Sequence, residues 1–178
     1  MTRMLSKIAI ATTALALTAG TAAAQRPQLS LGGGVAVPTG DLGEAQSAGW
    51  HGQVSMGYRP PMYPIGFRVD GLYHDMASDL SAGQNFRTAS VSGNVVLEAP
   101  ALAVRPYLIG GVGYYNTKFQ GARSRDGIGL NGGVGLKFRL ADIESFVEAR
   151  YHSAMNAVGP DGNERAAGFV PITFGVSF

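Results

Sequence analysis

Cysteine is absent from the 178 residues of the chain, which excludes disulfide bonds, thiolate metal sites and cysteine nucleophiles. Charged residues are also scarce, at 15% of the chain, where soluble domains carry about 25%. Glycine is instead abundant, with 26 residues. Few charges and many small side chains favour a sheet-rich protein in which small residues face one another.

The net charge gives no indication of a nucleic-acid partner. The formal charge is +2, from 14 basic and 12 acidic residues. Two of the basic residues, Arg3 and Lys7, belong to the leader described next, which leaves 12 basic residues against 12 acidic ones. A nearly neutral mature chain lacks the electrostatic footprint of a protein that binds DNA or RNA.

Residues 1–24 have the three parts of a secretory signal peptide. Arg3 and Lys7 form the basic start, residues 8–17 form a short apolar stretch, and small residues end the segment. The apolar stretch is too short for the about 20 residues of a membrane-spanning helix, so an uncleaved anchor is disfavoured. We therefore predict a cleaved signal peptide over 1–24 and one mature domain over 25–178.

Long apolar runs are missing from the mature chain. Arg105 interrupts the best candidate for a membrane helix, residues 101–115, so no helical span is expected. For a protein exported by a Gram-negative cell, two possibilities then remain. One is a soluble periplasmic protein, and the other is a β-barrel in the outer membrane.

Apolar residues alternate with small or polar ones throughout the mature chain. A lipid-facing strand must be apolar at every second position over about 9–11 residues. The clearest apolar face is formed by Val170, Ile172, Phe174, Val176 and Phe178. Similar alternation occurs in segments 29–36, 50–59, 65–74, 88–98, 104–114, 128–139 and 143–152. An even number of strands is required of bacterial barrels, so we predict an eight-stranded antiparallel transmembrane β-barrel.

A soluble β-sandwich also alternates, but two features argue against it. Charged residues occupy mid-strand positions on the polar faces. Aromatic residues end the apolar faces at two levels, as in the girdles that mark the two membrane interfaces. One level of this aromatic girdle is predicted to contain Trp50, Tyr73, Tyr114 and Tyr151, and the other Tyr58, Phe138 and Phe178.

The connections between the segments alternate between short and long. The short ones lie at 59–64, 99–101 and 140–142, and the long ones at 37–49, 76–85, 119–126 and 154–167. Outer-membrane barrels have short periplasmic turns and longer outer loops. We therefore expect both termini of the mature domain in the periplasm.

The interior of an eight-stranded barrel holds only its own side chains or one small ligand. Because isolated buried charges are costly, interior charges must be paired. The predicted interior charges balance, and we interpret them as a structural ion network that plugs the lumen; a proton or ion path is the alternative. The network consists of Arg68, Arg105, Lys137 and Arg150 with Asp70, Glu98, Glu144 and Glu148.

Two motifs suggest chemistry in the wrong structural context. Residues 127–132 match the dinucleotide-binding glycine pattern but lie inside a predicted strand and open no helix.

His152 and Ser153 suggest a hydrolase, but they are adjacent in a predicted strand, so their side chains face opposite sides of the sheet and cannot act together. The eight-stranded lipid A deacylases, which resemble this chain in size, place the two residues two positions apart. The spacing of His51, His74 and His152 in the sequence specifies no metal site. Since neither motif fits its structural context, we predict no catalytic residue, no cofactor and no metal.

Four segments carry a resemblance to a known family: 31–41, 105–115, 146–152 and 174–178. Through them the chain resembles the small outer-membrane β-barrel family that includes the OmpA membrane domain and OmpX. The resemblance implies an integral outer-membrane protein, expected as a monomer in contact with membrane lipid and lipopolysaccharide. Phe174, Val176 and Phe178 resemble the signal read by the barrel assembly machinery. No peptidoglycan-binding domain is expected after the last strand.

Fold does not settle function, and members of this family range from structural proteins to adhesins. We predict a non-enzymatic structural or cell-surface role, in envelope integrity or adhesion. The first alternative is a narrow, porin-like channel or a binder of one small apolar ligand. The second is an outer-membrane enzyme that modifies lipid.

Overall fold

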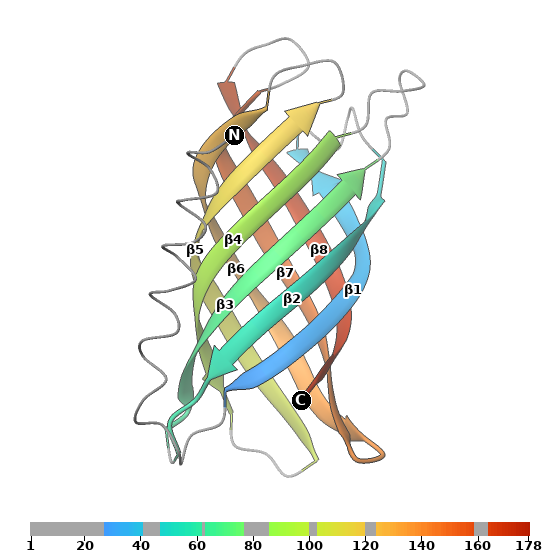
Figure 1. Cartoon of the computed structure of the whole chain (residues 1–178), viewed down its shortest axis with the longest axis vertical. Coiled ribbons are helices and arrows are strands. Elements are labelled where there is room, and N and C mark those ends of the chain that lie inside the picture. The colour runs from blue at the N-terminus through green and yellow to red at the C-terminus, as the bar shows by residue number, and fades with distance from the viewer. Residues whose placement is uncertain are drawn as a thin grey trace, which may run out of the picture.

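Eight long antiparallel strands form the protein (Figure 1). The computed structural model describes residues 27–40, 47–61, 63–76, 86–99, 103–119, 124–158 and 164–178, so the predicted signal peptide lies outside the described residues. The strands are β1 (Gln28–Thr39), β2 (Gly49–Tyr58), β3 (Ile65–Met76), β4 (Phe86–Glu98), β5 (Val104–Phe119), β6 (Arg125–Leu140), β7 (Ile143–Val158) and β8 (Glu164–Ser177).

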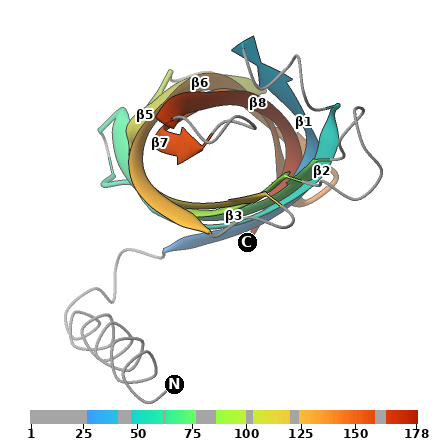
Figure 2. The ribbon, with the colours of Figure 1, turned by 90° about the horizontal axis from the view of Figure 1, so that it is seen from above.

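Each strand pairs with its neighbours in sequence, and β1 also pairs with β8, which closes the sheet into a barrel. Figure 2 shows the strands surrounding a single lumen. The prediction of an eight-stranded antiparallel barrel is therefore confirmed. No helix within the described ranges is long and apolar enough to cross a membrane.

Burial alternates along the strands in the manner that the sequence predicts. On β4, Ser92 and Asn94 are buried, whereas Val91 and Val95 are exposed. This polarity is the reverse of a soluble protein, in which apolar side chains are buried. It is the arrangement of a membrane barrel, whose outer surface meets lipid and whose interior is polar.

One rim of the barrel carries both ends of the sheet. Leu29 and Phe178 exchange two backbone hydrogen bonds there, of 3.2 and 2.8 Å, between the start of β1 and the residue after β8. The β6–β7 hairpin turns within two residues at the same rim, with Leu140 paired to Ile143. Ala141 takes a positive φ of 55° in this turn, a conformation that glycine usually supplies.

The strands extend further beyond the apolar segments than the sequence predicted. Residues 154–167 were expected to form a loop, but β7 and β8 continue to pair up to Val158 and Glu164. A register irregularity between Ala154 and Ala157 accompanies this extension. The prediction was wrong because alternation records which residues face lipid, whereas backbone hydrogen bonding continues above the lipid without any apolar pattern.

Candidate functional site in the barrel lumen

Charged and histidine side chains in the lumen lie in three layers between the two rims, with apolar residues such as Met76, Phe146 and Phe169 buried among them. The lower layer, nearest the rim with the short hairpin, contains Arg59, Glu98, Arg105, Lys137 and Glu144. The central layer contains Arg68, Asp70, Glu148 and Arg150. The upper layer contains His51, His74 and His152. The eight charged residues predicted for the interior thus fall into the lower and central layers.

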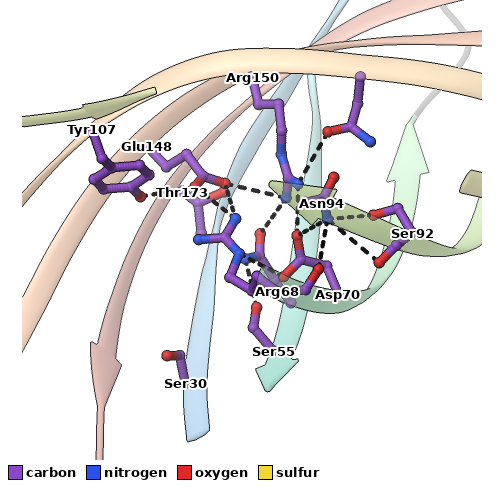
Figure 3. A network of polar contacts seen from close by, with 12 residues as sticks. Ser30, Ser55, Arg68, Asp70, Ser92, Asn94, Tyr107, Glu148, Arg150 and Thr173 are labelled. Carbon is purple, nitrogen blue, oxygen red and sulfur yellow. Dashed lines mark hydrogen bonds and ion pairs between the residues drawn. The ribbon is translucent and has the colours of Figure 1, made fainter. Parts of the chain in front are cut away.

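The central layer is a closed ring of two arginines and two carboxylates (Figure 3). Arg150, which is only 1% exposed, places Nη1 2.6 Å from Asp70 Oδ2 and Nη2 3.2 Å from Glu148 Oε1. Arg68 places Nε 2.8 Å from Asp70 Oδ1 and Nη2 2.7 Å from Glu148 Oε2. Since β3 and β7 are four strands apart in a barrel of eight, the Arg150–Asp70 and Arg68–Glu148 pairs cross the lumen, whereas the other two pairs each lie within one strand.

Uncharged side chains add hydrogen bonds to the carboxylates of the ring. Tyr107 Oη donates to Glu148 Oε2 at 2.8 Å, and Asn94 Nδ2 donates to Asp70 Oδ2 at 2.8 Å. A buried ion pair is stable only when additional hydrogen bonds satisfy its remaining polar atoms. The predicted network did not contain Tyr107 and Asn94. Both occupy the alternate strand positions that face the lumen, so the alternation in the sequence could have identified them.

The lower layer is centred on Glu98, whose side chain is 1% exposed. It accepts contacts from Lys137 Nζ at 2.9 Å, Arg59 Nη1 at 2.7 Å and Arg105 Nη1 at 3.2 Å. Arg105 also pairs with Glu144. The predicted network did not contain Arg59, although this residue continues the inward-facing parity of β2. Lys137 and Arg139 flank the same turn as Glu144, and the ion pair of Lys137 is with Glu98.

The upper layer joins three histidines to two aromatic side chains. The His51 and His74 rings are 5.4 Å apart, and the His74 and His152 rings 6.3 Å apart. His152 Nδ1 lies 2.8 Å from Tyr115 Oη, and Phe169 stacks on the His152 ring at 5.2 Å. Across the described ranges, no three potential metal ligands are arranged to hold an ion. The three imidazoles thus pack with Tyr115 and Phe169 as an aromatic cluster.

His74 differs from His152 in its hydrogen bonding, which permits a paired test. Both rings are fully buried, but neither nitrogen of His74 has a hydrogen-bond partner within the described part of the protein. Replacing His74 with phenylalanine should leave the free energy of unfolding unchanged or raise it by about 1 kcal/mol, because no hydrogen bond is lost. His152→Phe should lower it by about 1 to 2 kcal/mol, because the Tyr115 hydroxyl loses its partner.

Urea unfolding of the two variants from lipid vesicles measures this difference. If His74→Phe destabilises the barrel as much as His152→Phe, the two imidazoles have equivalent polar roles and the assignment of His74 to simple packing is wrong.

The residues of the two suggestive motifs do not assemble a site. His152 is fully buried in the lumen, whereas Ser153 lies on the other face of β7, so the two side chains are separated by the barrel wall. Residues 127–132 lie within β6 and open no helix. The geometry therefore offers neither a histidine–serine pair nor a phosphate-binding loop.

The predicted girdle residues lie on the outer surface to different degrees. Four upper residues and one lower residue are exposed: Trp50, Tyr73, Tyr114, Tyr151 and Phe178. Tyr58 and Phe138 are half-buried. The Trp50 and Tyr73 rings form a tilted pair with centroids 5.6 Å apart. Of the residues predicted to signal assembly, Phe174 faces outward like Phe178, and Val176 is half-buried between them.

A closed sheet with an apolar outside and paired charges inside defines the class of transmembrane β-barrels. The chain belongs to the outer membrane protein beta-barrel domain family, whose sequence profile matches residues 9–177. The family places the protein among the barrels of the outer membrane, as the sequence predicted. No curated protein matches the chain.

Solved structures of outer-membrane barrels share the fold at low sequence identity. Neisserial surface protein A is 16% identical, with a TM-score of 0.68 over 85% of this chain and 95% of its own. A major outer membrane protein from Thermus thermophilus is 13% identical, with a TM-score of 0.62 over 87% and 98%. OprG from Pseudomonas aeruginosa is 13% identical, with a TM-score of 0.55 over 86% and 97%. At these identities the likeness establishes the fold alone.

Proposed function

We propose that this outer-membrane barrel is non-enzymatic and closed to ions, and that its role is structural or at the cell surface. The observation that carries the proposal is the central ring, in which the Arg150–Asp70 and Arg68–Glu148 pairs link opposite walls of the lumen. All four side chains are at most one-tenth exposed. A filled interior leaves the outer surface and the connections between strands as the parts available for function.

Ion passage would require the ring to open. A permeating ion would have to separate buried charges, and breaking a buried pair by removing one partner typically costs about 3 to 5 kcal/mol. The lower layer adds a second barrier, because Glu98 binds three cationic groups from three different parts of the chain. These two layers support a plugged lumen over a narrow channel.

The orientation that we propose places both ends of the sheet in the periplasm. The start of β1, the end of β8 and the two-residue β6–β7 hairpin share one rim. Short turns are typical of the periplasmic side of outer-membrane barrels. The opposite rim, with the connections after β1, β3, β5 and β7, would then face the outside of the cell.

A monomer surrounded by outer-membrane lipid is the state that we propose for the barrel. Exposed apolar side chains occur on all eight strands, which supports contact with lipid around the whole circumference. Folding into that state would require the barrel assembly machinery, as for other barrels whose last strand alternates in this way.

Conductance across planar lipid bilayers tests the plugged lumen. We expect the folded protein, identified by its heat-modifiable mobility on gels, to insert without producing current steps, because paired side chains fill the interior. A general porin inserted into the same bilayers serves as the positive control. Reproducible steps from the folded protein, altered in size by Arg150→Met, would show that ions pass through the central ring and would refute the proposal.

A further inference from the structure

Two cationic side chains stand opposite each other on the outer surface of the barrel. Arg87 of β4 and Lys118 of β5 are partners in the strand register. Their neighbours Thr88 and Thr117 are buried in the lumen, so Arg87 and Lys118 face outward, and both are exposed. Like charges directly opposite each other in adjacent strands are destabilising unless something compensates them.

Of the two cations, Arg87 has an ion-pair partner among the described residues. Arg87 Nε lies 3.0 Å from Asp75 Oδ2 on the neighbouring strand β3. Within the part of the chain that the structure describes, Lys118 has no hydrogen bond or ion-pair partner. A second outward-facing carboxylate among the described residues nearby, Asp126, accepts a hydrogen bond from Asn116 Nδ2 at 2.5 Å. Lys118 is therefore a second exposed cation, one strand away from the Arg87–Asp75 pair.

The surface below this pair is apolar. The next outward-facing residues toward the centre of the barrel are Ala89 and Val91 on β4, and Tyr114 and Val112 on β5 beyond Asn116. Val91 and Val112 are 60% and 58% exposed. A ligand on this face would meet cations at the rim and aliphatic surface beneath them. Those are the two requirements of a lipid with an anionic headgroup.

An apolar groove continues the same face further down. It has a volume of about 620 Å³ and is lined in part by Val69, Gly93, Val95, Gly110 and Val112. Gly93 is the outward-facing residue after Val91, and no atom lies within 4 Å of where its side chain would begin. An acyl chain descending from the rim would reach this groove along the two strands that carry Arg87 and Lys118.

We infer that Arg87 and Lys118 form a binding site for the phosphate group of an outer-leaflet glycolipid, with an acyl chain of that lipid lying against β4 and β5. This inference rests on the proposed function in one respect, which is the orientation that places the rim with Arg87 and Lys118 at the outer face of the membrane. Phosphate on the rim neutralises the like-charged pair, and Tyr114 lies at the level where an amphipathic ring meets headgroups.

Binding of lipid A to the protein purified from outer membranes tests the site. The protein is transferred into phosphatidylcholine nanodiscs and titrated with bisphosphorylated lipid A, and bound lipid is measured by native mass spectrometry. Since each cation near a charged lipid surface contributes about a factor of five in affinity, Lys118→Gln should weaken binding about fivefold, and the Arg87→Gln/Lys118→Gln double variant should weaken it at least as much. Lys118→Arg should bind like the native protein.

Two controls separate this site from general attraction. Arg139→Gln removes one cation near the opposite rim and should leave binding unchanged. Fully dephosphorylated lipid A should bind the native protein and Lys118→Gln equally. Equal binding of bisphosphorylated lipid A by the native protein and Lys118→Gln would overturn the inference, and so would an equal loss in Arg139→Gln. Neither result affects bilayer conductance, so failure of this site is distinguishable from failure of the plugged barrel.

Discussion

Replacing Arg150 with methionine is expected to lower the free energy of unfolding by about 3 to 5 kcal/mol. Methionine keeps most of the side-chain length but removes the charge that lies between Asp70 and Glu148. Arg68 then remains as the single cation between two buried carboxylates. A buried charge that loses its partner retains its desolvation cost without the compensating attraction, so this one substitution acts on the whole central ring.

Unfolding in urea from lipid vesicles provides the measurement. Trp50 is the single tryptophan of the chain and is 57% exposed on the outer surface, so its fluorescence reports transfer from lipid to water. Arg139→Met, which removes a cation near a rim, should change the free energy of unfolding by less than about 0.5 kcal/mol. A loss of less than about 1 kcal/mol in Arg150→Met would mean that water already solvates the ring.

A second substitution distinguishes loss of charge balance from loss of packing. Asp70→Asn removes one carboxylate, so the double variant Asp70→Asn/Arg150→Met again has one cation, Arg68, facing one anion, Glu148. We expect the double variant to be more stable than the sum of the two single effects predicts, by about 2 kcal/mol. Additive effects would show that Arg150 acts through its volume rather than its charge.

Gly133→Ala is expected to destabilise the barrel by about 3 kcal/mol or to prevent it from closing. Gly133 of β6 faces the lumen where β6 lies against β7. A methyl group there would overlap the Ala149 carbonyl oxygen and lie 2.6 Å from Arg150 Cα. Both contacts are with backbone, which cannot rotate away as a flexible side chain can, so the two strands would have to separate beside the central ring.

The adjacent glycine supplies a matched control. Gly132 faces lipid, and the nearest atom to its added methyl group would be the Ile109 carbonyl oxygen at 3.8 Å, an ordinary contact. Gly132→Ala should therefore be neutral or stabilise the barrel by about 0.5 kcal/mol, because alanine restricts the unfolded chain. Heat-modifiable mobility gives the folded fraction, and urea unfolding gives the free energy. Equal effects of the two substitutions would contradict this account of the lumen-facing glycine.

Individual strands illustrate how far sequence reasoning extends. On β3 the alternation of Phe67 and Val69 with Arg68 and Asp70 was sufficient to predict which side chains enter the lumen, and the structure places them there. The same reasoning failed above the apolar segments. It assigned residues 154–167 to a loop, although β7 and β8 stay paired as far as Val158 and Glu164, because outside the lipid nothing selects apolar residues at alternate positions.

The alternation of apolar and polar residues could not predict which charged side chains pair across the lumen. Glu98 and Arg105 flank one short connection and lie close along the chain, and they meet at 3.2 Å. No such argument leads from Asp70 on β3 to Arg150 on β7, which belong to opposite walls. Arg59 likewise reaches Glu98 from a different hairpin. The hydrogen bond from the Tyr107 hydroxyl to the Glu148 carboxylate forms only because both side chains face the lumen at the same height.

The sequence by itself determined that this protein is an eight-stranded barrel, and it determined which side of each strand meets lipid. That much is local, because lipid on one face and a polar lumen on the other impose an alternation that every strand must satisfy by itself. Only the tertiary structure decided which buried charges pair. Their heights depend on strand tilt and on the stagger with which β1 joins β8, and both are properties of the closed barrel as a whole.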